Sequence, residues 1–234
     1  MLYERADQIL DDLDEAKRAA TSLRKEVRGS VRLCVWPTFA KRCLLPHIAG
    51  LFERHPELRI DLDLSERLHE PVLGRTDLAI RIGELTSSSL VALRLGTQTS
   101  TVAASPTYLK KHGTPQTVAE CAEHRLIDKR RITPFMGWRI LLGESRKVQR
   151  QLVLQTDDLE AQVDACSAGI GLVFLPMWTL TDHLRTGNLV RISVKDLDLR
   201  SDADVYLLRN PGAPTAAIDA VSQFVRTIVP QFMN

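Results

Sequence analysis

The first 27 residues form one continuous amphipathic pattern. The segment contains no Gly or Pro, and its apolar positions are separated alternately by four and three residues. This spacing is the heptad repeat of a helix that pairs with another helix, because it places the apolar side chains in one narrow stripe. A helix that packs on the body of its own domain is the alternative. The stripe that we assign to dimerisation contains Leu2, Ile9, Leu13 and Leu23.

After residue 29 the pattern changes to alternating strands and helices. The order strand, helix, strand indicates parallel strands with helices on the faces of the sheet. The fold class is therefore α/β. The apolar runs predict a helix over residues 39–55 and strands over residues 31–36, 58–64, 77–82, 90–95 and 101–104.

The second half continues the same order of elements and begins with two clear helix starts. Ser105 followed by Pro106 is an N-cap signature, and Thr117 with Glu120 has capping-box spacing. The remaining predictions are a strand over 126–128, a hairpin of 136–143 with 147–156, a helix from a Thr156 cap to 168, a buried strand over 172–175, a helix from 176 to about 187, a strand over 204–208 and a helix over 218–229.

The charge of the chain is nearly balanced. Its 31 basic and 29 acidic residues leave a formal net charge of +2 at pH 7, which does not by itself define a nucleic-acid-binding or membrane-binding surface. No run reaches the roughly 20 apolar residues of a membrane span, and no secretory signal opens the chain. We therefore expect a cytoplasmic protein that does not contact a membrane.

The sequence contains no pattern typical of a catalytic or metal site. The four cysteines lack C-x-x-C spacing, and the six histidines show neither H-x-x-x-H nor H-E-x-x-H pairing. We interpret the cysteines as reduced, mostly buried thiols. There is no nucleophile elbow, and the two glycines at 169 and 171 follow a helix, as in a turn, rather than a strand, as in a phosphate-binding loop. We expect no enzyme activity, no cofactor and no metal.

The stretch WPTFAKRCLLPHI, residues 36–48, joins an apolar strand to a helix with two cations in its first turn. Helix N-termini have positive partial charge, so Lys41 and Arg42 are unfavourable there unless an anion faces them. Thr38 is the predicted cap, and ligands of doubly wound sheets bind beyond the carboxyl ends of the strands. We expect an anionic ligand at this helix end. Cations that simply point to water are the alternative.

The helix predicted to begin at Thr156 provides a comparison. Asp157 and Asp158 already supply the negative charge that its N-terminus prefers. A carboxylate ligand is therefore expected at the Thr38 end rather than at the Thr156 end.

Five segments of the chain form a recognisable set through their order and spacing. They are RGSVRLCV, LLPHIAGLFERHPELRIDLDLSE, DLAIRIG, SSSLVALRLGTQTSTVAASPTYLKKHGTP and DACSAGIGLVFLP. Together they resemble the effector-binding half of the LysR-type transcriptional regulators of bacteria, over essentially the whole chain. The resemblance implies two Rossmann-like subdomains, built like periplasmic binding proteins and joined by crossing strands, with an effector cleft between them and a linker helix in front.

The resemblance also implies a division of the chain. Residues 1–28 correspond to the linker and dimerisation helix, residues 30–100 with 206–234 to the first regulatory subdomain, and residues 101–205 to the second. Family members begin with a winged helix-turn-helix, which this sequence lacks. DNA binding is therefore expected only through that part of a parent protein.

The family's effector pocket is bordered by segments that can be matched residue by residue to this chain. Arg81 is expected to act as a guanidinium fork for an acid, or else as a surface cation. Phe174 either lines the cavity or packs in the core, the usual place of an aromatic residue on a buried strand. The matched effector-binding residues are Thr38, Phe39, Arg81, Gly83, Thr101, Asp128, Thr156 and Asp157.

We therefore expect the ligand-sensing and dimerising domain of a LysR-type regulator, which binds a small anionic effector and so modulates DNA binding. Its expected partners are the effector and a second copy of the chain, in a homodimer or a higher oligomer. Two other classes were weighed. A free-standing solute-binding protein of the same fold is disfavoured by the missing export signal and by the heptad helix. An enzyme on a two-lobed α/β scaffold is disfavoured because no catalytic constellation is present.

Overall fold

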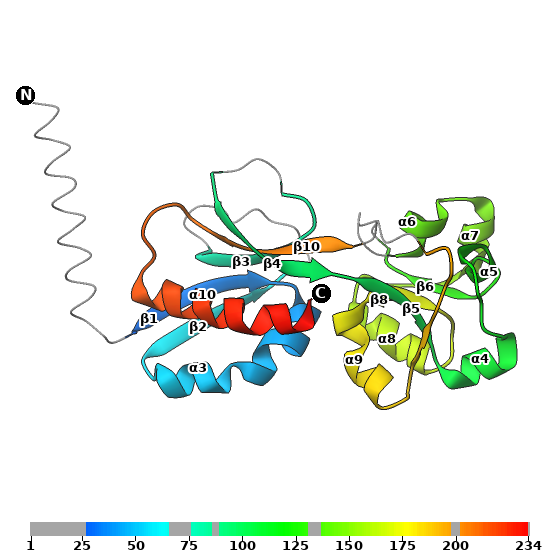
Figure 1. The fold of residues 1–234 in the computed structure, drawn as a ribbon, viewed down its shortest axis with the longest axis horizontal. Helices are drawn as coiled ribbons and strands as arrows, with labels where there is room; N and C mark the ends of the chain where they lie inside the picture. The colour runs from blue at the N-terminus through cyan, green and yellow to red at the C-terminus, as the bar shows by residue number, and fades with distance from the viewer. Residues whose placement is uncertain (1–26, 66–75, 86–88, 131–136, 198–201, 234) are drawn as a thin grey trace, which may run out of the picture.

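The computed structural model describes residues 27–65, 76–85, 89–130, 137–197 and 202–233. The dimerisation stripe predicted from Leu2, Ile9, Leu13 and Leu23 lies outside these residues. The described elements form two bodies that lie side by side along the long axis of the molecule (Figure 1). The first body is built around a five-stranded sheet and the second around a three-stranded sheet.

The sheet of the first body is mixed, with the strand order β2-β1-β3-β10-β4. β1 runs parallel to β2 and β3, as the sequence predicted, whereas β10 is antiparallel to β3 and β4. β10 lies in this sheet from Ala203 onward, three residues before the boundary predicted at residue 206. The strands are β1 (Gly29–Val35), β2 (Leu58–Leu64), β3 (Leu78–Ile82), β4 (Val91–Gln98) and β10 (Ala203–Arg209).

The second body contains an antiparallel sheet in the order β8-β5-β9 and a parallel pair, β6 with β7. An isolated bridge between Leu126 and Leu172 links the two sheets. β9 was not predicted, because three residues are too few to show an alternating pattern. The strands are β5 (Ser100–Ala104), β6 (Leu126–Asp128), β7 (Leu152–Gln155), β8 (Val173–Pro176) and β9 (Val190–Ile192).

The chain passes between the two bodies at one crossover. β4 ends at Gln98 and β5 begins at Ser100, so a single residue, Thr99, separates the two sheets (Figure 1). On its return, the chain enters the first body at Ala203, which lies opposite Gln98 in the β4–β10 ladder. The crossing strands that the family resemblance implied are therefore present.

The helix predicted over residues 39–55 is wrong as a single regular element. The segment instead contains α2 (Pro37–Phe39), the π-helix η1 (Ala40–Leu44), the 3-10 helix η2 (Leu45–His47) and α3 (Ala49–Arg54). Pro46 explains the interruption, because its ring nitrogen has no hydrogen to donate to the carbonyl one turn earlier. The chain accommodates it by changing the helical repeat on both sides. The first body is completed by α10 (Ala216–Ile228), which packs against β1 and η1, and by η4 (Val229–Phe232).

The second body contains the helices α4 (Pro106–His112), α5 (Val118–Cys121), α6 (Trp138–Leu142), α7 (Arg146–Gln151), α8 (Leu159–Ser167) and α9 (Met177–Arg185). The caps predicted at Ser105 and Thr117 are confirmed, since their hydroxyls accept from the backbone N–H groups three residues later. The hairpin predicted between residues 136 and 156 is wrong. Ser145 caps α7 instead, and Trp138 of α6 and Val148 of α7 are buried, whereas Ile140 and Val153 are exposed.

One glycine of this body is required by its surroundings. Gly171 lies just before β8, and a Cβ there would overlap the backbone carbonyl of Arg125. The close approach allows the Leu172 N–H to donate to the same carbonyl at 2.8 Å, which joins β8 to the segment before β6.

The larger hydrophobic cluster of the described residues extends through both bodies. It includes Leu33, Ile80 and Val205 of the five-stranded sheet together with Val163 of α8 and Trp178 of α9. A second cluster lies within the second body, where the ring centroids of Phe174 and Trp138 are 5.9 Å apart. Phe174 is thus a core residue. None of the described helices combines the length and the apolar character needed to cross a membrane.

Candidate functional site

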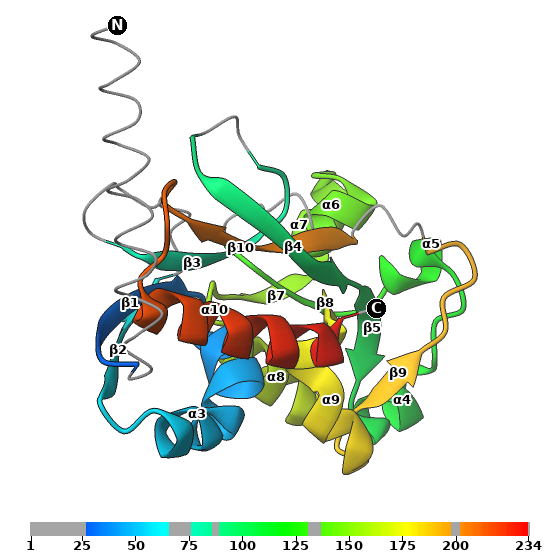
Figure 2. The same cartoon turned by 60° about the vertical axis from the view of Figure 1, so that its left-hand side comes forward.

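The two bodies meet where the carboxyl end of β1 faces α9. Phe39 and Trp178 form an edge-to-face pair with ring centroids 5.1 Å apart, and both side chains are buried. The Trp178 Nε1–H donates to Gln98 Oε1 at 2.9 Å, so the same indole also contacts the crossover. We call this contact region, defined by Trp36, Phe39, Gln98, Lys129 and Trp178, the junction. Figure 2 shows α9 beside the helical segment that follows β1.

Thr38 lies in the junction but does not cap a helix. The residue before α2 is Trp36, Pro37 occupies the first helical position, and no side chain caps this end. Thr38 is only 5% exposed, and its hydroxyl has no hydrogen-bond partner within the part of the chain that the structure describes. The predicted cap is therefore wrong, but a hydroxyl without a partner among the described residues remains at the predicted position, on a side chain that is largely buried. The neighbouring Phe39 is fully buried in the core.

The two cations near the start of this helical segment pair with acids of the second body. Lys41 Nζ lies 3.8 Å from Glu160, and Arg42 lies 3.7 Å from Glu160 and 3.3 Å from Asp182. The structure thus supports neither an anionic ligand at these two side chains nor free cations in water. Because the groups are partly exposed, each ion pair contributes at most about 1 kcal/mol.

Lys129 is the cation among the residues that define the junction, and its side chain is buried. The side chain follows β6 directly, is 5% exposed, and places Nζ 5.0 Å from the centroid of the Trp36 ring. The cation–π contact joins the end of β6 to the end of β1 across the two bodies. Lys129 was not selected from the sequence. The available signal was its place directly after a buried strand, because α/β proteins bind ligands at the edge of the sheet where such strands end.

Asp128 uses its carboxylate to hold α6. Oδ1 accepts from the backbone N–H groups of Lys129 at 2.8 Å and Trp138 at 3.1 Å, and Oδ2 accepts from the Arg139 Nε–H at 3.3 Å. Gly137 has φ +101°, and a Cβ there would lie 2.5 Å from Asp128 Oδ1. Burial raises the pKa of the Asp128 carboxyl, whereas these hydrogen bonds and the Arg139 charge oppose the rise. These contacts hold the start of α6 and the backbone after β6, and the expected contact of Asp128 with an effector stays a prediction.

Arg139 extends this arrangement to the backbone of Lys129. Its guanidinium donates to the carbonyl oxygens of Lys129 and Arg130, in addition to its ion pair with Asp128. The Asp128 and Arg139 pair therefore fixes the path of the chain at the buried cation.

The start of α8 also differs from the prediction. Asp158 caps the helix by accepting from the N–H groups of Glu160 at 2.8 Å and Ala161 at 3.3 Å. Thr156 instead accepts from the Asp158 N–H through its hydroxyl, and it donates its own N–H to the Asp128 carbonyl at 3.0 Å. The Thr156 cap is thus wrong by two residues, and its hydroxyl is engaged in a turn. Asp157 is partly buried beside it.

The remaining predicted residues lie on the strands that approach the junction. Arg81 of β3 lies opposite Tyr206 of β10, is partly buried, and forms no hydrogen bond or ion pair with another described residue. Gly83 has φ +98° and donates its N–H to the Asp204 carbonyl at 2.9 Å. Thr101 is 1% exposed, and its hydroxyl already accepts from Arg191 Nε–H at 3.1 Å. Among these three residues, donors for a ligand are left on Arg81 and on the Thr101 hydroxyl, which acts only as an acceptor in its contact with Arg191.

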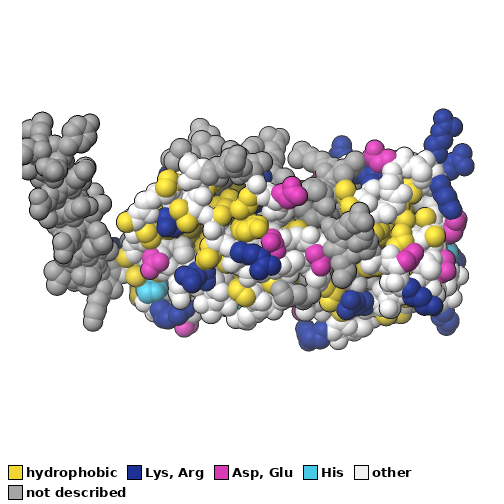
Figure 3. All heavy atoms as spheres, turned by 45° about the horizontal axis from the view of Figure 1, so that its top comes forward, with side chains coloured by type: hydrophobic (Ala, Val, Ile, Leu, Met, Phe, Trp, Pro, Cys, Tyr) yellow, Lys and Arg dark blue, Asp and Glu magenta, His cyan; other side chains and the backbone are white. Residues whose placement is uncertain are grey.

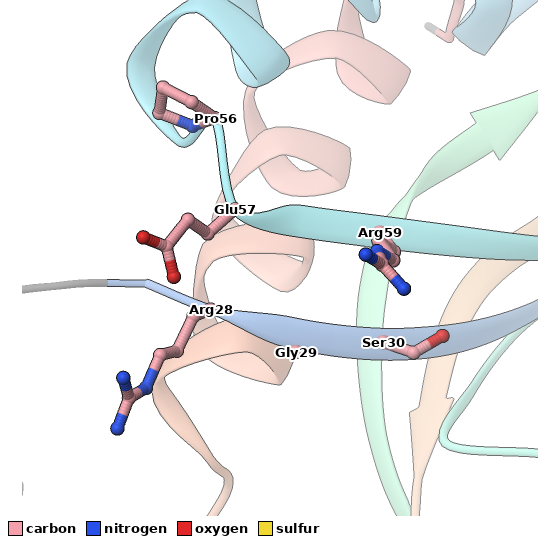
Figure 4. Close-up of a pocket in the computed structure, with 6 residues that line it drawn as sticks. All are labelled: Arg28, Gly29, Ser30, Pro56, Glu57 and Arg59. Atoms are coloured by element: carbon pink, nitrogen blue, oxygen red, sulfur yellow. The ribbon is translucent and has the colours of Figure 1, made fainter.

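A pocket of about 710 Å³ lies at the opposite, amino-terminal end of β1 and β2. In Figure 4 its side chains come from the starts of these two strands and the turn before β2. The pocket is open to solvent and forms a surface feature, because most of the residues around it are exposed. It is lined by Arg28, Gly29, Ser30, Pro56, Glu57 and Arg59.

The distribution of charged side chains on the surface and the burial of the cysteines are typical of an ordinary globular domain. Basic and acidic side chains are interspersed over the face that Figure 3 shows, in agreement with the nearly balanced net charge. Burial raises the pKa of Cys43, Cys121 and Cys166 to about 12, so these thiols are protonated at neutral pH. No group of three or more potential metal ligands occurs in the described ranges.

Two α/β bodies joined at a crossover, with buried polar groups between them, define a two-lobed ligand-binding domain. The model of the LysR substrate binding domain matches residues 24–229, and the chain belongs to this family. The family assignment made from the sequence is confirmed. The chain is an effector-sensing regulatory domain, and the comparisons give no support to a free-standing solute-binding protein.

Relatives in sequence are transcriptional regulators. An uncharacterized HTH-type transcriptional regulator of Haemophilus influenzae is 32% identical over 195 residues, which are 82% of this chain and 67% of the relative. The HTH-type transcriptional regulator DmlR of Escherichia coli is 26% identical over 227 residues, 96% of this chain and 73% of the relative.

Solved structures share the fold. The LysR-type regulator CrgA of Neisseria meningitidis has a TM-score of 0.75 at 24% identity, covering 99% of this chain and 78% of CrgA. Full-length AphB of Vibrio cholerae has a TM-score of 0.72 at 23% identity, covering 95% of this chain and 76% of AphB. The predicted α/β architecture of two subdomains is thereby confirmed.

Proposed function

We propose that the chain senses a small anionic effector at the junction and transmits its binding to DNA-binding parts of a LysR-type regulator. The observation that carries the proposal is Lys129, a buried ammonium group located between the two bodies. Thr38, a largely buried residue, supplies a hydroxyl two residues after Trp36, whose ring the ammonium contacts. An ammonium and a hydroxyl are both hydrogen-bond donors for a carboxylate.

A position between the bodies also explains how binding is sensed. A ligand that contacts Thr38 of the first body and Lys129 of the second favours the arrangement in which both contacts are made. A ligand shifts a conformational equilibrium only through such differential contacts. Arg81, with donors free among the described residues, is a further candidate ligand on the first body.

The proposal is tested with paired ligands and paired variants. Acetate, propionate, succinate and benzoate are compared with their carboxamides by thermal shift and calorimetry, and the acids are expected to raise the unfolding midpoint. Lys129→Met keeps a long side chain on Trp36 but removes the charge, so acid affinity should fall about 10- to 100-fold. Lys41→Met, at a half-exposed cation that pairs with Glu160 near the junction, is the matched control and should leave affinity unchanged. Equal losses in the two variants, or equal binding of acids and amides, contradict the proposal.

We further propose that the chain is cytoplasmic and self-associates, and that DNA is bound by another part of a parent protein rather than by this chain. The heptad spacing of residues 2–27 supports self-association. The relatives that are named transcriptional regulators support the DNA-binding parent and, with it, the location. Analytical ultracentrifugation at micromolar concentration is expected to show dimers or larger species. A single species of 26.2 kDa would remove self-association from the proposal.

A further inference from the structure

Three enclosed polar atoms at the crossover have no hydrogen-bond partner among the described residues. They are Gln98 Nε2, Ser100 Oγ and Asp202 Oδ1. Gln98 is 1% exposed and Ser100 is 4% exposed. Native proteins retain few buried polar groups without partners, so three such atoms in one region need an explanation.

The geometry brings these residues together. Gln98 ends β4 and Ser100 begins β5, two residues apart, and the Asp202 carboxylate accepts a hydrogen bond from the Ser100 backbone N–H. Asp202 directly precedes Ala203, which lies opposite Gln98 in the β4–β10 ladder. The three side chains thus belong to one crossover.

Trp178 determines which end of the Gln98 amide is free. The indole N–H can only donate, so the amide oxygen must face it, as the 2.9 Å contact with Oε1 shows. The amide nitrogen is therefore the unpaired group. Gln98 Nε2 offers donors, Asp202 Oδ1 an acceptor, and Ser100 Oγ one of each.

This set matches a hydroxyl or amino group and does not match a carboxylate or a methyl group. A ligand hydroxyl has a donor and acceptor sites, so it complements both the Gln98 amide N–H and the Asp202 oxygen, whereas a protonated amino group complements the acceptors Asp202 Oδ1 and Ser100 Oγ. A ligand carboxylate would meet the negative charge of Asp202, and a methyl group would leave all three atoms unpaired. Burial raises the pKa of Asp202, which a donating ligand group would counteract.

We propose that Gln98, Ser100 and Asp202 form a specificity subsite for a hydroxyl or amino substituent of the effector. The inference rests on the proposed function, because it takes the carboxylate of the same ligand to lie at Lys129 and Thr38. Trp178 connects the two places, since its ring packs on Phe39, next to Thr38, and its N–H binds Gln98. The subsite selects substituted acids over the parent acids.

The test measures discrimination between matched acids with the full chain. Calorimetry compares lactate with propionate and 3-hydroxybutyrate with butyrate, and the hydroxy acid is expected to bind about 10-fold more tightly in at least one pair. Ser100→Ala should reduce this ratio to near one while leaving the affinity for the parent acid unchanged. Because the Ser100 hydroxyl has no partner among the described residues, Ser100→Ala should not lower the unfolding midpoint of the ligand-free protein.

Ser105→Ala is the matched control. Ser105 is also buried, at 2% exposure, but its hydroxyl accepts from the Tyr108 N–H at 3.2 Å. This variant should lower the midpoint and leave the ratio unchanged. If hydroxy acids show no preference, or if Ser100→Ala lowers the midpoint as Ser105→Ala does, the subsite holds only structural water and the inference fails alone. If no acid of either kind binds, the proposed function fails with it.

Discussion

Replacing Asp128 by Asn is expected to destabilise the second body and to weaken effector binding together. The new amide would keep one carbonyl oxygen for the N–H groups of Lys129 and Trp138, but it would turn its N–H₂ group towards Arg139. The Arg139 side chain is 11% exposed and would lose its buried counter-charge. Removing one partner of a buried ion pair typically costs about 3–5 kcal/mol, and the retained hydrogen bonds place the expected loss near the lower end, about 3 kcal/mol.

The assay compares this change with the same substitution at an exposed pair. Asp204 accepts from Arg94 at 2.9 Å, but the side chains are 34% and 56% exposed, so Asp204→Asn should cost at most about 1 kcal/mol. For a chain of this size, the midpoint of thermal unfolding should fall by about 6–12 °C for Asp128→Asn and by no more than about 4 °C for the control. Equal shifts in the two variants would refute the assignment of Asp128 as a buried structural hub.

Two further measurements separate structure from function in this region. The double variant Asp128→Asn with Arg139→Gln removes both charges and should recover part of the lost stability. Because Arg139 also binds the Lys129 carbonyl, carboxylate affinity should fall in Asp128→Asn even under conditions where the protein is fully folded. Unchanged affinity would show that the position of Lys129 does not depend on this pair.

The exposed carboxyl of the control also predicts a dependence of stability on pH. Hydrogen bonds from Arg94 and Thr97 lower the pKa of Asp204 to about 2, so its contribution to stability is present above 3.8 and is lost as pH falls towards 2. The difference in unfolding free energy between wild type and Asp204→Asn, measured by urea unfolding between about pH 2 and 6, should therefore shrink as pH falls. A difference that does not change with pH would contradict this assignment.

Three other changes have defined outcomes. Thr38→Val should weaken carboxylate binding, measured by calorimetry, about 10-fold or more, and should change stability, measured by urea unfolding, by less than about 1 kcal/mol. Thr156→Val removes a hydroxyl that is engaged in a turn, so it should lower stability and leave carboxylate affinity unchanged. Burial lowers the pKa of His124 below 6.5, so its contribution to stability should be lost as pH falls below 6.5, and His124→Phe should flatten that part of the urea-unfolding profile. Gly171→Ala should cost about 1–3 kcal/mol by thermal unfolding, because the new methyl group meets the Arg125 carbonyl; no change would mean that the backbone can shift there.

Local patterns predicted those parts of the fold that depend on near neighbours in the chain. The alternation of Val31, Leu33 and Val35 predicts a strand with one buried face, and all three are buried in β1. The caps at Ser105 and Thr117 were predicted correctly, because a cap joins a side chain to a backbone N–H three residues later. The same local reasoning failed at Thr156, where Asp158 competes for the same helix end and forms the cap instead.

The character of the junction depended on the tertiary structure. Arg42 meets Asp182 from 140 positions away, and no local pattern identifies such a partner. Lys129 looks like a surface residue in the sequence, yet the fold buries it over Trp36. The sequence by itself determined the family and the β-α-β order, because those follow from spacing along the chain. The tertiary structure alone decided which polar groups are paired, which are buried and which lack partners. Burial and long-range pairing depend on distances in space rather than on separation in the sequence, so they were fixed only when the two bodies packed together.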